Sequence, residues 1–242
     1  MSRVIWHDVE CGGYTADLEL WRELARATGD PVLDVGAGTG RVARHLEAAG
    51  HEVVALDNDE ELLAVLRRRA PGVQTVVADA AEFHLDRSFA LIAVPMQTIQ
   101  LLPDRAGFFA SARRAVRPGG LVALAIADAL EGFDAEAEMP PPDVGQADGW
   151  RYVSQPTAVR PVSPGGSPPA SPREGGARIE RLRYAIAPDG ARTTERDAIV
   201  LAAVTAEQLE AEGAAAGLIP EPARHIDATP EHVGSRVVLL RG

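Results

Sequence analysis

Apolar and polar positions follow two alternating patterns along the first half of the chain. Short, unbroken apolar runs predict strands at 32–35, 52–56, 73–78, 89–94 and 121–127. Between them, apolar residues recur at helical spacing and predict helices at 16–28, 39–49, 60–69 and 104–116. Continuous apolar strands that alternate with amphipathic helices are typical of a parallel sheet buried on both faces.

Local signals mark where several of these elements begin and end. Gly29-Asp30-Pro31 ends the first helix and opens the first strand. Asp59 is positioned to cap the helix that starts at residue 60, whose first turn is acidic and whose last turn holds three arginines. This order of charges suits the helix dipole.

The pattern changes after Asp128. Nine of the 18 prolines lie between Pro140 and Pro172, and Ser163–Gly176 has almost no apolar content, which predicts a flexible loop. Alternation returns in Arg178–Ala187 and Thr193–Ala202, on either side of Pro188-Asp-Gly190, and predicts an antiparallel hairpin. A helix near 205–216 and a last strand at 236–240 are expected to follow.

The charge and the choice of basic residues exclude several classes of function. The net charge is −11, which argues against a nucleic-acid partner because binding the phosphate backbone requires clustered positive charge. All 24 basic residues are arginine, so a Walker-type or Schiff-base lysine is excluded.

Cysteine usage and hydropathy complete this picture. The single cysteine, Cys11, cannot form an internal disulfide, and no Cys/His spacing resembles a metal site. No signal-like amino terminus and no apolar run approaching about 18 residues is seen, so we expect a cytoplasmic protein without a membrane partner.

The stretch Val32-Leu-Asp-Val-Gly-Ala-Gly-Thr-Gly-Arg41 carries the candidate chemistry. Its glycines allow a sharp turn from strand to helix and a close approach of the backbone to a ligand. Asp57 ends the next strand and offers two acceptor oxygens, which match the two hydroxyl groups of a ribose. This arrangement is typical of sites for nucleoside-containing cofactors at the edge of a parallel sheet.

The glycine spacing is G-x-G-x-G, and Arg41 stands where a dinucleotide fold places its third glycine. It resembles motif I, VLDxGxGxG, of the class I S-adenosylmethionine-dependent methyltransferases of small molecules. Four more segments match in order: Asp57, Ala78-Asp79-Ala80, Phe89–Pro95 and Arg117-Pro-Gly-Gly120. The resemblance covers roughly residues 14–128 and, more weakly, 195–242.

This resemblance implies the fold and its division. We expect an α/β, Rossmann-like, doubly wound and mostly parallel seven-stranded sheet with an antiparallel strand insertion. A single methyltransferase domain is expected over 1–242, with a cofactor-binding core at 29–128. Residues 129–200 would form an inserted cap that contains the flexible loop 163–176, and 201–242 would complete the sheet.

The resemblance also implies S-adenosylmethionine as cofactor. Asp57 would bind its ribose, Asp79 would accept from the adenine amino group, and Gly36 and Gly38 would lie against the methionine portion. From the residues alone, Asp57 and Asp79 could instead cap a helix or a turn, and Asp34 could either hold the loop or face the ligand. The full set of expected cofactor contacts is Tyr14, Asp34, Gly36, Ala37, Gly38, Asp57, Asn58, Asp79, Ala80 and Pro95.

Methyl transfer from a sulfonium is an in-line displacement, in which the protein chiefly aligns donor and acceptor. The segment Val94–Gln100 lacks the Asn/Asp-Pro-Pro-Tyr/Phe motif of enzymes that methylate nucleic-acid or amide nitrogens, so we expect a small-molecule acceptor and no metal. The weak candidates for acting on the acceptor are His7, Gln97 and Gln100, and each has an incidental structural role as its alternative. Trp150 and Tyr152 either line an acceptor pocket or pack against the hairpin.

Two other functions compete with methyl transfer. A regulatory protein that binds S-adenosylmethionine without catalysis would share the same motifs, because the sequence identifies no definite catalytic base. A nicotinamide-dependent oxidoreductase is disfavoured because the third glycine and a Tyr-x-x-x-Lys pair are both missing.

Overall fold

The computed structural model describes residues 3–127, 140–163, 175–229 and 232–242. The chain forms two compact units, each assembled from three stretches of sequence. One comprises residues 15–127, 205–227 and 235–242, and we call it the sheet unit. The other comprises residues 1–14, 128–204 and 228–234, and we call it the hairpin unit.

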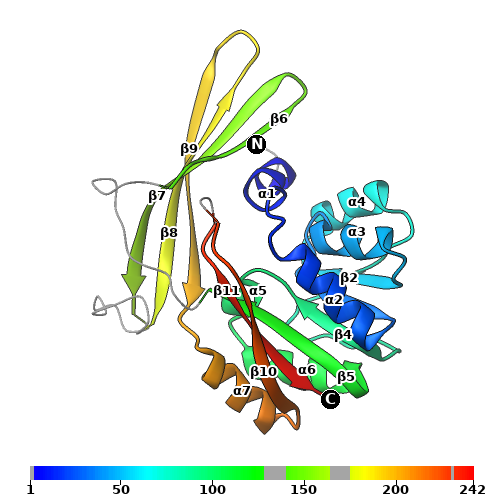
Figure 1. Ribbon diagram of the computed structural model, residues 1–242. Helices are drawn as coiled ribbons and strands as arrows, with labels where there is room; N and C mark the ends of the chain where they lie inside the picture. The colour runs from blue at the N-terminus through cyan, green and yellow to red at the C-terminus, as the bar shows by residue number, and fades with distance from the viewer. Residues whose placement is uncertain (1–2, 128–139, 164–174, 230–231) are drawn as a thin grey trace. The chain divides into compact units, whose positions relative to one another are not determined.

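The sheet unit is built on a seven-stranded sheet with the order β10-β11-β5-β4-β1-β2-β3 (Figure 1). The five strands from β5 to β3 run parallel, whereas β11 pairs antiparallel with β5 and β10 antiparallel with β11. The strands are β1 (Val32–Val35), β2 (Val53–Asp57), β3 (Gln74–Val77), β4 (Phe89–Val94), β5 (Val116–Ile126), β10 (Ile219–Ile226) and β11 (Ser235–Arg241).

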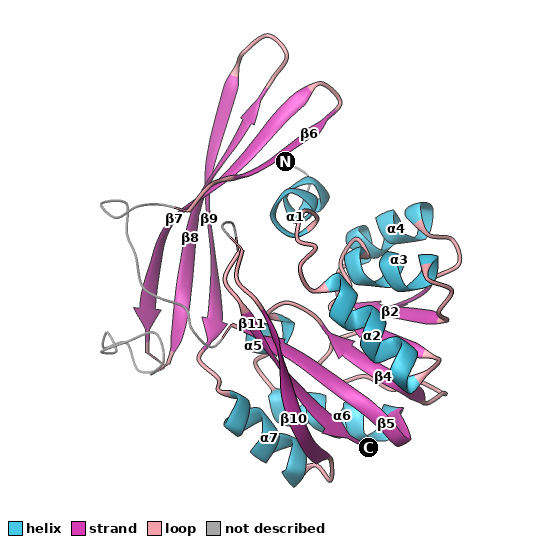
Figure 2. Ribbon diagram, in the orientation of Figure 1, coloured by secondary structure: helices cyan, strands magenta, loops and turns pink. Residues whose placement is uncertain are grey.

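Amphipathic helices flank this sheet (Figure 2). They are α2 (Leu18–Thr28), α3 (Arg41–Ala48), α4 (Glu60–Arg69), α5 (Thr98–Leu101), α6 (Arg105–Ala115) and α7 (Ala206–Ala215). Asp59 caps α4, as predicted, because its Oδ1 accepts from the backbone N–H groups of Glu61 and Leu62. Every residue of β1 and β4 is buried, as expected for central strands covered on both faces.

The hairpin unit contains α1 (Arg3–Cys11) and a four-stranded antiparallel sheet of order β6-β7-β8-β9. These strands are β6 (Asp143–Ala147), β7 (Trp150–Val162), β8 (Gly176–Ile186) and β9 (Arg192–Ala202). A small core of Trp6, Tyr152 and Ala185 joins α1 to the sheet. The predicted hairpin is therefore confirmed as β8 and β9.

The predicted α/β fold with a seven-stranded, mostly parallel sheet and an antiparallel insertion is confirmed. Sequence reasoning missed α1, α5 and β6, and also the proline-containing strands β7 and β10. Two of these strands place proline where pairing is irregular or absent: Pro156 lies at a shift of register in β7, and β10 is an edge strand with its own shift. The expected turn Arg117-Pro-Gly-Gly120 instead lies within β5.

Most of the segment predicted to be a flexible loop, residues 164–174, lies outside the described residues. Gly176, at its end, opens β8. Within the described parts of the chain, no helix is both long enough and apolar enough to span a bilayer.

Candidate functional site

The order of strands creates one position in the sheet unit where a ligand can enter between adjacent loops. β1 pairs with β2 on one side and with β4 on the other, so the connections that leave these strands wind in opposite directions. In open α/β sheets, ligands bind at this point, outside the carboxyl ends of the strands. The loops that follow β1, β2, β3 and β4 all emerge at that edge.

The loop after β1 has a backbone conformation that favours glycine. Gly36, Gly38 and Gly40 have φ angles of +73°, +55° and +88°. The N–H groups of Gly36 and Ala37 both donate to the carbonyl oxygen of Leu56, at 2.8 and 3.1 Å, which fixes the loop on β2. A Cβ at position 36 would lie 2.5 Å from Cγ2 of Thr98, so the start of α5 packs directly against the glycine turn.

Asp57, at the end of β2, joins two of these loops. Its Oδ2 accepts from the N–H of Gly38 at 2.8 Å, and its Oδ1 accepts from the N–H of Asp59 at 2.9 Å. Each carboxylate oxygen has a further lone pair, so the group remains able to accept from a pair of hydroxyls. Asn58 follows and is exposed. The role of Asp57 as a ribose ligand stays a prediction.

Asp79 lies in the loop after β3 and makes the turn that the alternative interpretation expected. Its Oδ1 accepts from the N–H of Ala81 at 2.8 Å, and an isolated bridge joins Asp79 to Glu82. Among the described residues, its Oδ2 has no hydrogen-bond partner. Ala80 is buried beside it. An adenine contact by Asp79 is compatible with this turn and stays a prediction.

Asp34 is buried in β1, with a relative exposure of 1%. Its Oδ2 accepts from the N–H of Ala43 at 3.0 Å, across the glycine loop in α3. Its Oδ1 is also buried and has no hydrogen-bond partner among the described residues. Burial in this apolar strand raises the pKa of Asp34 to about 7, although Arg41 and the Ala43 N–H favour the ionised form.

An ion pair that sequence reasoning missed holds α3 to the segment that precedes α2. The guanidinium of Arg41 binds both oxygens of Asp17, with Nη2 at 2.7 Å from Oδ2. Trp21 Nε1 donates to the same Oδ2 at 2.8 Å. Asp17 is fully buried, so this pairing satisfies a charge that would otherwise be costly. The spacing of Asp17 and Trp21, one helical turn apart, was the available signal.

The loop after β4 contains Pro95, Met96 and Gln97 and leads into α5 at Thr98. Met96 adopts a φ of +51°, which is uncommon for a residue with a side chain and typical of functional turns. Pro95 is a buried residue, and its carbonyl oxygen accepts a hydrogen bond from the Thr98 hydroxyl at 3.0 Å. Gln97 is half-buried and directly precedes α5 without capping it through its side chain.

Gln100 has a structural role in the sheet unit. Its side chain is 3% exposed, and its amide pairs with the backbone of Ala127: Oε1 accepts from N–H at 2.9 Å and Nε2 donates to the carbonyl at 3.2 Å. These bonds hold α5 to the end of β5. The structure therefore favours the structural alternative for Gln100, and its role toward an acceptor stays a prediction.

The remaining candidates belong to the hairpin unit. Tyr14 is buried and its ring packs against that of His232, with the ring centroids 4.8 Å apart and the planes tilted by 41°. His7 lies on α1 and is half-buried. Tyr152 packs edge-on against Trp6, and Trp150 packs against the same core. Packing therefore accounts for the burial of both Tyr152 and Trp150.

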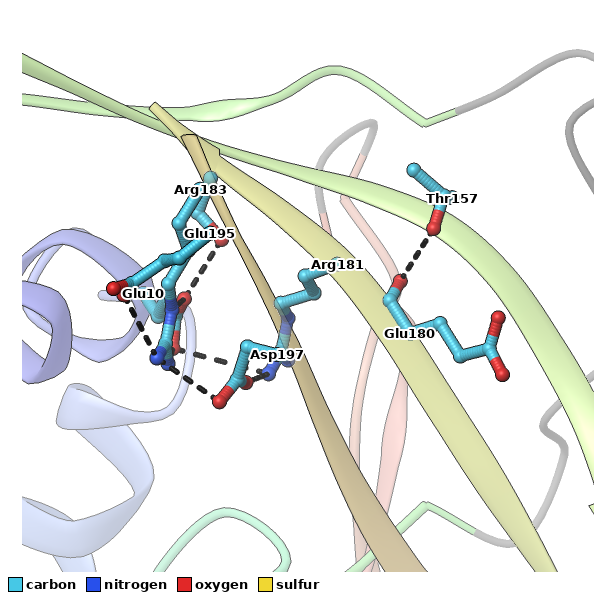
Figure 3. A network of polar contacts seen from close by, with 8 residues as sticks. Glu10, Thr157, Glu180, Arg181, Arg183, Glu195 and Asp197 are labelled. Carbon is cyan, nitrogen blue, oxygen red and sulfur yellow. Dashed lines mark hydrogen bonds and ion pairs between the residues drawn. The ribbon is translucent and has the colours of Figure 1, made fainter. Parts of the chain in front are cut away.

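A charged network lies between α1 and the sheet of the hairpin unit (Figure 3). Glu10 accepts two hydrogen bonds from Arg183, at 2.7 and 2.8 Å, and one from Ser154 at 2.7 Å. Arg183 also pairs with Asp197 at 2.9 Å. Burial disfavours the ionised form of Glu10, but these bonds and the nearby guanidiniums outweigh it and lower the pKa of Glu10.

Within the described ranges, no group of His, Cys, Asp or Glu side chains is arranged to hold a metal ion.

Comparison with known proteins agrees with this geometry. Residues 32–120 match the family model described as "Methyltransferase domain". A probable S-adenosylmethionine-dependent methyltransferase of Mycobacterium tuberculosis is 32% identical over 116 residues, which are 48% of this chain and 42% of that protein. A trans-aconitate 2-methyltransferase of Acidovorax is 31% identical over 116 residues, or 47% and 45% of the two chains. The matches thus span less than half the length of these relatives.

Known structures extend the likeness in fold to almost the whole chain. The sugar N-methyltransferase KedS8 of Streptoalloteichus has a TM-score of 0.75 at 20% identity, over 100% of this chain and 94% of its own. DesVI of Streptomyces venezuelae has a TM-score of 0.73 at 19% identity, over 98% of each chain. Residues 32–120, which contain the glycine loop clamped by Asp57, are therefore similar to a methyltransferase domain.

Proposed function

We propose that the protein is an enzyme that binds S-adenosylmethionine in the sheet unit and transfers its methyl group to a small-molecule acceptor. The observation that carries this proposal is the glycine turn Gly36–Gly40, held at the point where the winding of the sheet reverses by the Asp57 carboxylate. Five matching sequence segments in the right order and the matched domain model support it.

The residues at this edge fit the cofactor. Asp57 retains acceptor lone pairs for the two ribose hydroxyls, and Asp79 retains Oδ2 for an amino group of the base. The backbone of Gly36, Ala37 and Gly38 has no bulky side chain that would block the methionine portion. When bound, the cofactor supplies an electrophilic methyl group, and the task of the chain is to align the acceptor with it.

The acceptor is proposed to be a small molecule rather than a macromolecule. Relatives named for trans-aconitate and similar folds named for amino sugars support this class. The acidic charge of the chain disfavours nucleic acid. One of these names refers to a carboxylic acid and the other to a sugar nitrogen, so carboxylic acids and amines are both appropriate first substrates to test.

Calorimetric titration with S-adenosylmethionine, S-adenosylhomocysteine and NAD tests the cofactor assignment. We expect the two adenosyl compounds to bind and NAD not to bind. Asp57→Ala should weaken binding of S-adenosylmethionine at least tenfold, or about 1.4 kcal/mol, because it removes both the ribose acceptor and the clamp on Gly38. Asp86→Ala, which removes a fully exposed carboxylate of the same unit, is the matched control and should bind normally.

A turnover screen against metabolite pools, read by mass spectrometry, tests whether the protein is an enzyme. A mass increase of one methyl group that depends on the donor identifies the acceptor. Tight donor binding without turnover of any carboxylate or amine would instead favour a regulatory protein that binds S-adenosylmethionine. Equal affinity of wild type and Asp57→Ala would refute the assigned ribose contact.

A further inference from the structure

The buried carboxyl group of Asp34 has no ion-pair partner of its own among the described residues. Only one of its oxygens is hydrogen-bonded, to the N–H of Ala43, although both are inaccessible to solvent. The other positions of β1 are the apolar residues Val32, Leu33 and Val35, all fully buried. A buried carboxylate without full pairing is costly, so this position is unfavourable for a charge in the free protein.

The charged groups that face Asp34 do not compensate for a negative charge on its carboxyl group. They are Arg41 from α3, Asp57 from β2 and Asp17 from the segment before α2. Arg41 is the only cation of the set, and its guanidinium already binds both oxygens of Asp17. One guanidinium and two carboxylates therefore act on Asp34, and the guanidinium is bound to one of those carboxylates. Burial and the two neighbouring carboxylates accordingly keep the pKa of Asp34 near 7.

The glycine loop begins two residues after Asp34, so a cation bound at this loop would be the missing counter-charge. The two forms of the cofactor differ in this respect. S-adenosylmethionine carries a sulfonium and a net positive charge, whereas S-adenosylhomocysteine is a neutral thioether. A ligand shifts a protonation equilibrium only if it interacts differently with the two protonation states, and the sulfonium form meets this condition.

We propose that Asp34 makes this site selective for the charge of its ligand: the carboxyl group releases its proton when the cationic donor binds, and regains one when the neutral product takes its place. The proton passes to and from solvent, and no covalent bond other than O–H changes. The inference rests on the proposed function. It makes Asp34 a residue that determines specificity between donor and product, in addition to its structural bond to Ala43.

The dependence of affinity on pH follows from this coupling. With a pKa near 7, about a tenth of Asp34 is ionised at pH 6 and about nine tenths at pH 8. If the donor prefers the ionised form, its apparent affinity scales with that fraction. The preference for S-adenosylmethionine over S-adenosylhomocysteine, as a ratio of dissociation constants, should therefore rise about tenfold from pH 6 to pH 8.

Calorimetry of the full-length protein measures this directly. Both compounds are titrated at pH 6 and pH 8, and also at pH 7 in buffers with small and large enthalpies of ionisation. S-adenosylmethionine should release a substantial fraction of a proton at pH 7, so its observed enthalpy should depend on the buffer. The enthalpy for S-adenosylhomocysteine should depend on the buffer far less.

One variant and one control test whether the Asp34 carboxyl group causes the dependence on pH. Asp34→Asn keeps an oxygen for the Ala43 N–H but cannot ionise, so its preference for donor over product should not change between pH 6 and pH 8. The amino group of each ligand titrates equally in both proteins, and comparison with wild type removes its contribution. Asp104→Asn, an exposed acid of the same unit whose cap an asparagine preserves, should behave as wild type.

The outcomes separate the two proposals. If neither adenosyl compound binds at either pH, the proposed function fails. The proposed role of Asp34 is wrong if both compounds bind but the wild-type preference for S-adenosylmethionine over S-adenosylhomocysteine is the same at pH 6 and pH 8. It is also wrong if binding of S-adenosylmethionine releases no proton at pH 7. In either case the cofactor assignment stands. If Asp34→Asn does not fold, the proton release of the wild-type protein alone decides the question.

Discussion

At the scale of single residues, the ion pair of Asp17 and Arg41 fixes the start of α3 against the segment before α2. The carboxylate is fully buried and accepts from Arg41 and from Trp21 Nε1. Arg41 occupies the position where a dinucleotide-binding fold has its third glycine. In this chain the residue at that position therefore forms a buried ion pair with Asp17.

Replacing one member of this ion pair should lower the free energy of unfolding more than replacing both members with apolar residues. Asp17→Ala leaves a buried guanidinium and an indole N–H without their acceptor, and should lower the free energy of unfolding by about 3–5 kcal/mol. Urea denaturation followed by tryptophan fluorescence measures this. The double variant Asp17→Leu with Arg41→Met should be less destabilised, and an equal or larger loss in that variant would contradict the account.

Sequence reasoning predicts residues whose partners are near in the chain or whose role follows from a motif. Asp59 was expected to cap α4 and does so with neighbouring N–H groups. Gln100 was not expected to bind Ala127, and Asp17 was not expected to bind Arg41, because these partners lie 27 and 24 residues apart. Only the winding of the chain through the sheet brings such pairs together.

At the scale of elements, the glycine turn and α5 form one packed assembly. Gly36→Ala adds a Cβ 2.5 Å from Thr98 at a φ of +73°. We expect this variant to bind S-adenosylmethionine at least tenfold more weakly and to melt at a lower temperature, because both the turn and α5 must shift. Calorimetry and thermal denaturation give the two values.

Gly50→Ala is the matched control for that substitution. Its φ is +92°, but a Cβ there meets nothing within 4 Å. It should therefore show the cost of the left-handed backbone, about 1–2 kcal/mol, with normal cofactor affinity. If Gly50→Ala weakened binding as much as Gly36→Ala, close packing against Thr98 would not explain the effect.

The elements also show where pattern reasoning ends. The range of β4 was predicted to the residue, because its apolar run is continuous and lies between Ser88 and Pro95. β7 was missed because Pro156 and Pro161 interrupt its alternation, and β10 because Pro220 and Pro222 do the same. Such strands tolerate proline at edges and at shifts of register, which only pairing with other strands reveals.

At the scale of the whole molecule, the stability of the hairpin unit should depend on the network around Glu10. Arg183→Met removes two hydrogen bonds from a carboxylate that is largely buried. We expect a loss of about 3 kcal/mol or more at pH 7, measured by thermal denaturation. Arg178→Met, on the same strand but with an exposed side chain, is the control and should change stability little.

The dependence on pH provides a second measurement of the same network. Because the pKa of Glu10 is lower in the folded protein, its contribution is fully present above the unfolded value of about 4.3 and is lost as pH falls through the folded value. The difference in stability between wild type and Arg183→Met should therefore shrink as the pH is lowered below about 4. A constant difference down to that pH would show that the network contributes through packing alone.

The path of the chain through the two units limits how such a protein can acquire new chemistry in evolution. Both units are assembled from three separated stretches, and residues 1–14 and 228–234 join 128–204 in one of them. No single cut divides the molecule into its two units, so neither can be duplicated or exchanged as one uninterrupted gene fragment. New chemistry on this scaffold is thus expected to arise by point substitution, or by replacing the long middle stretch while the flanking segments are retained.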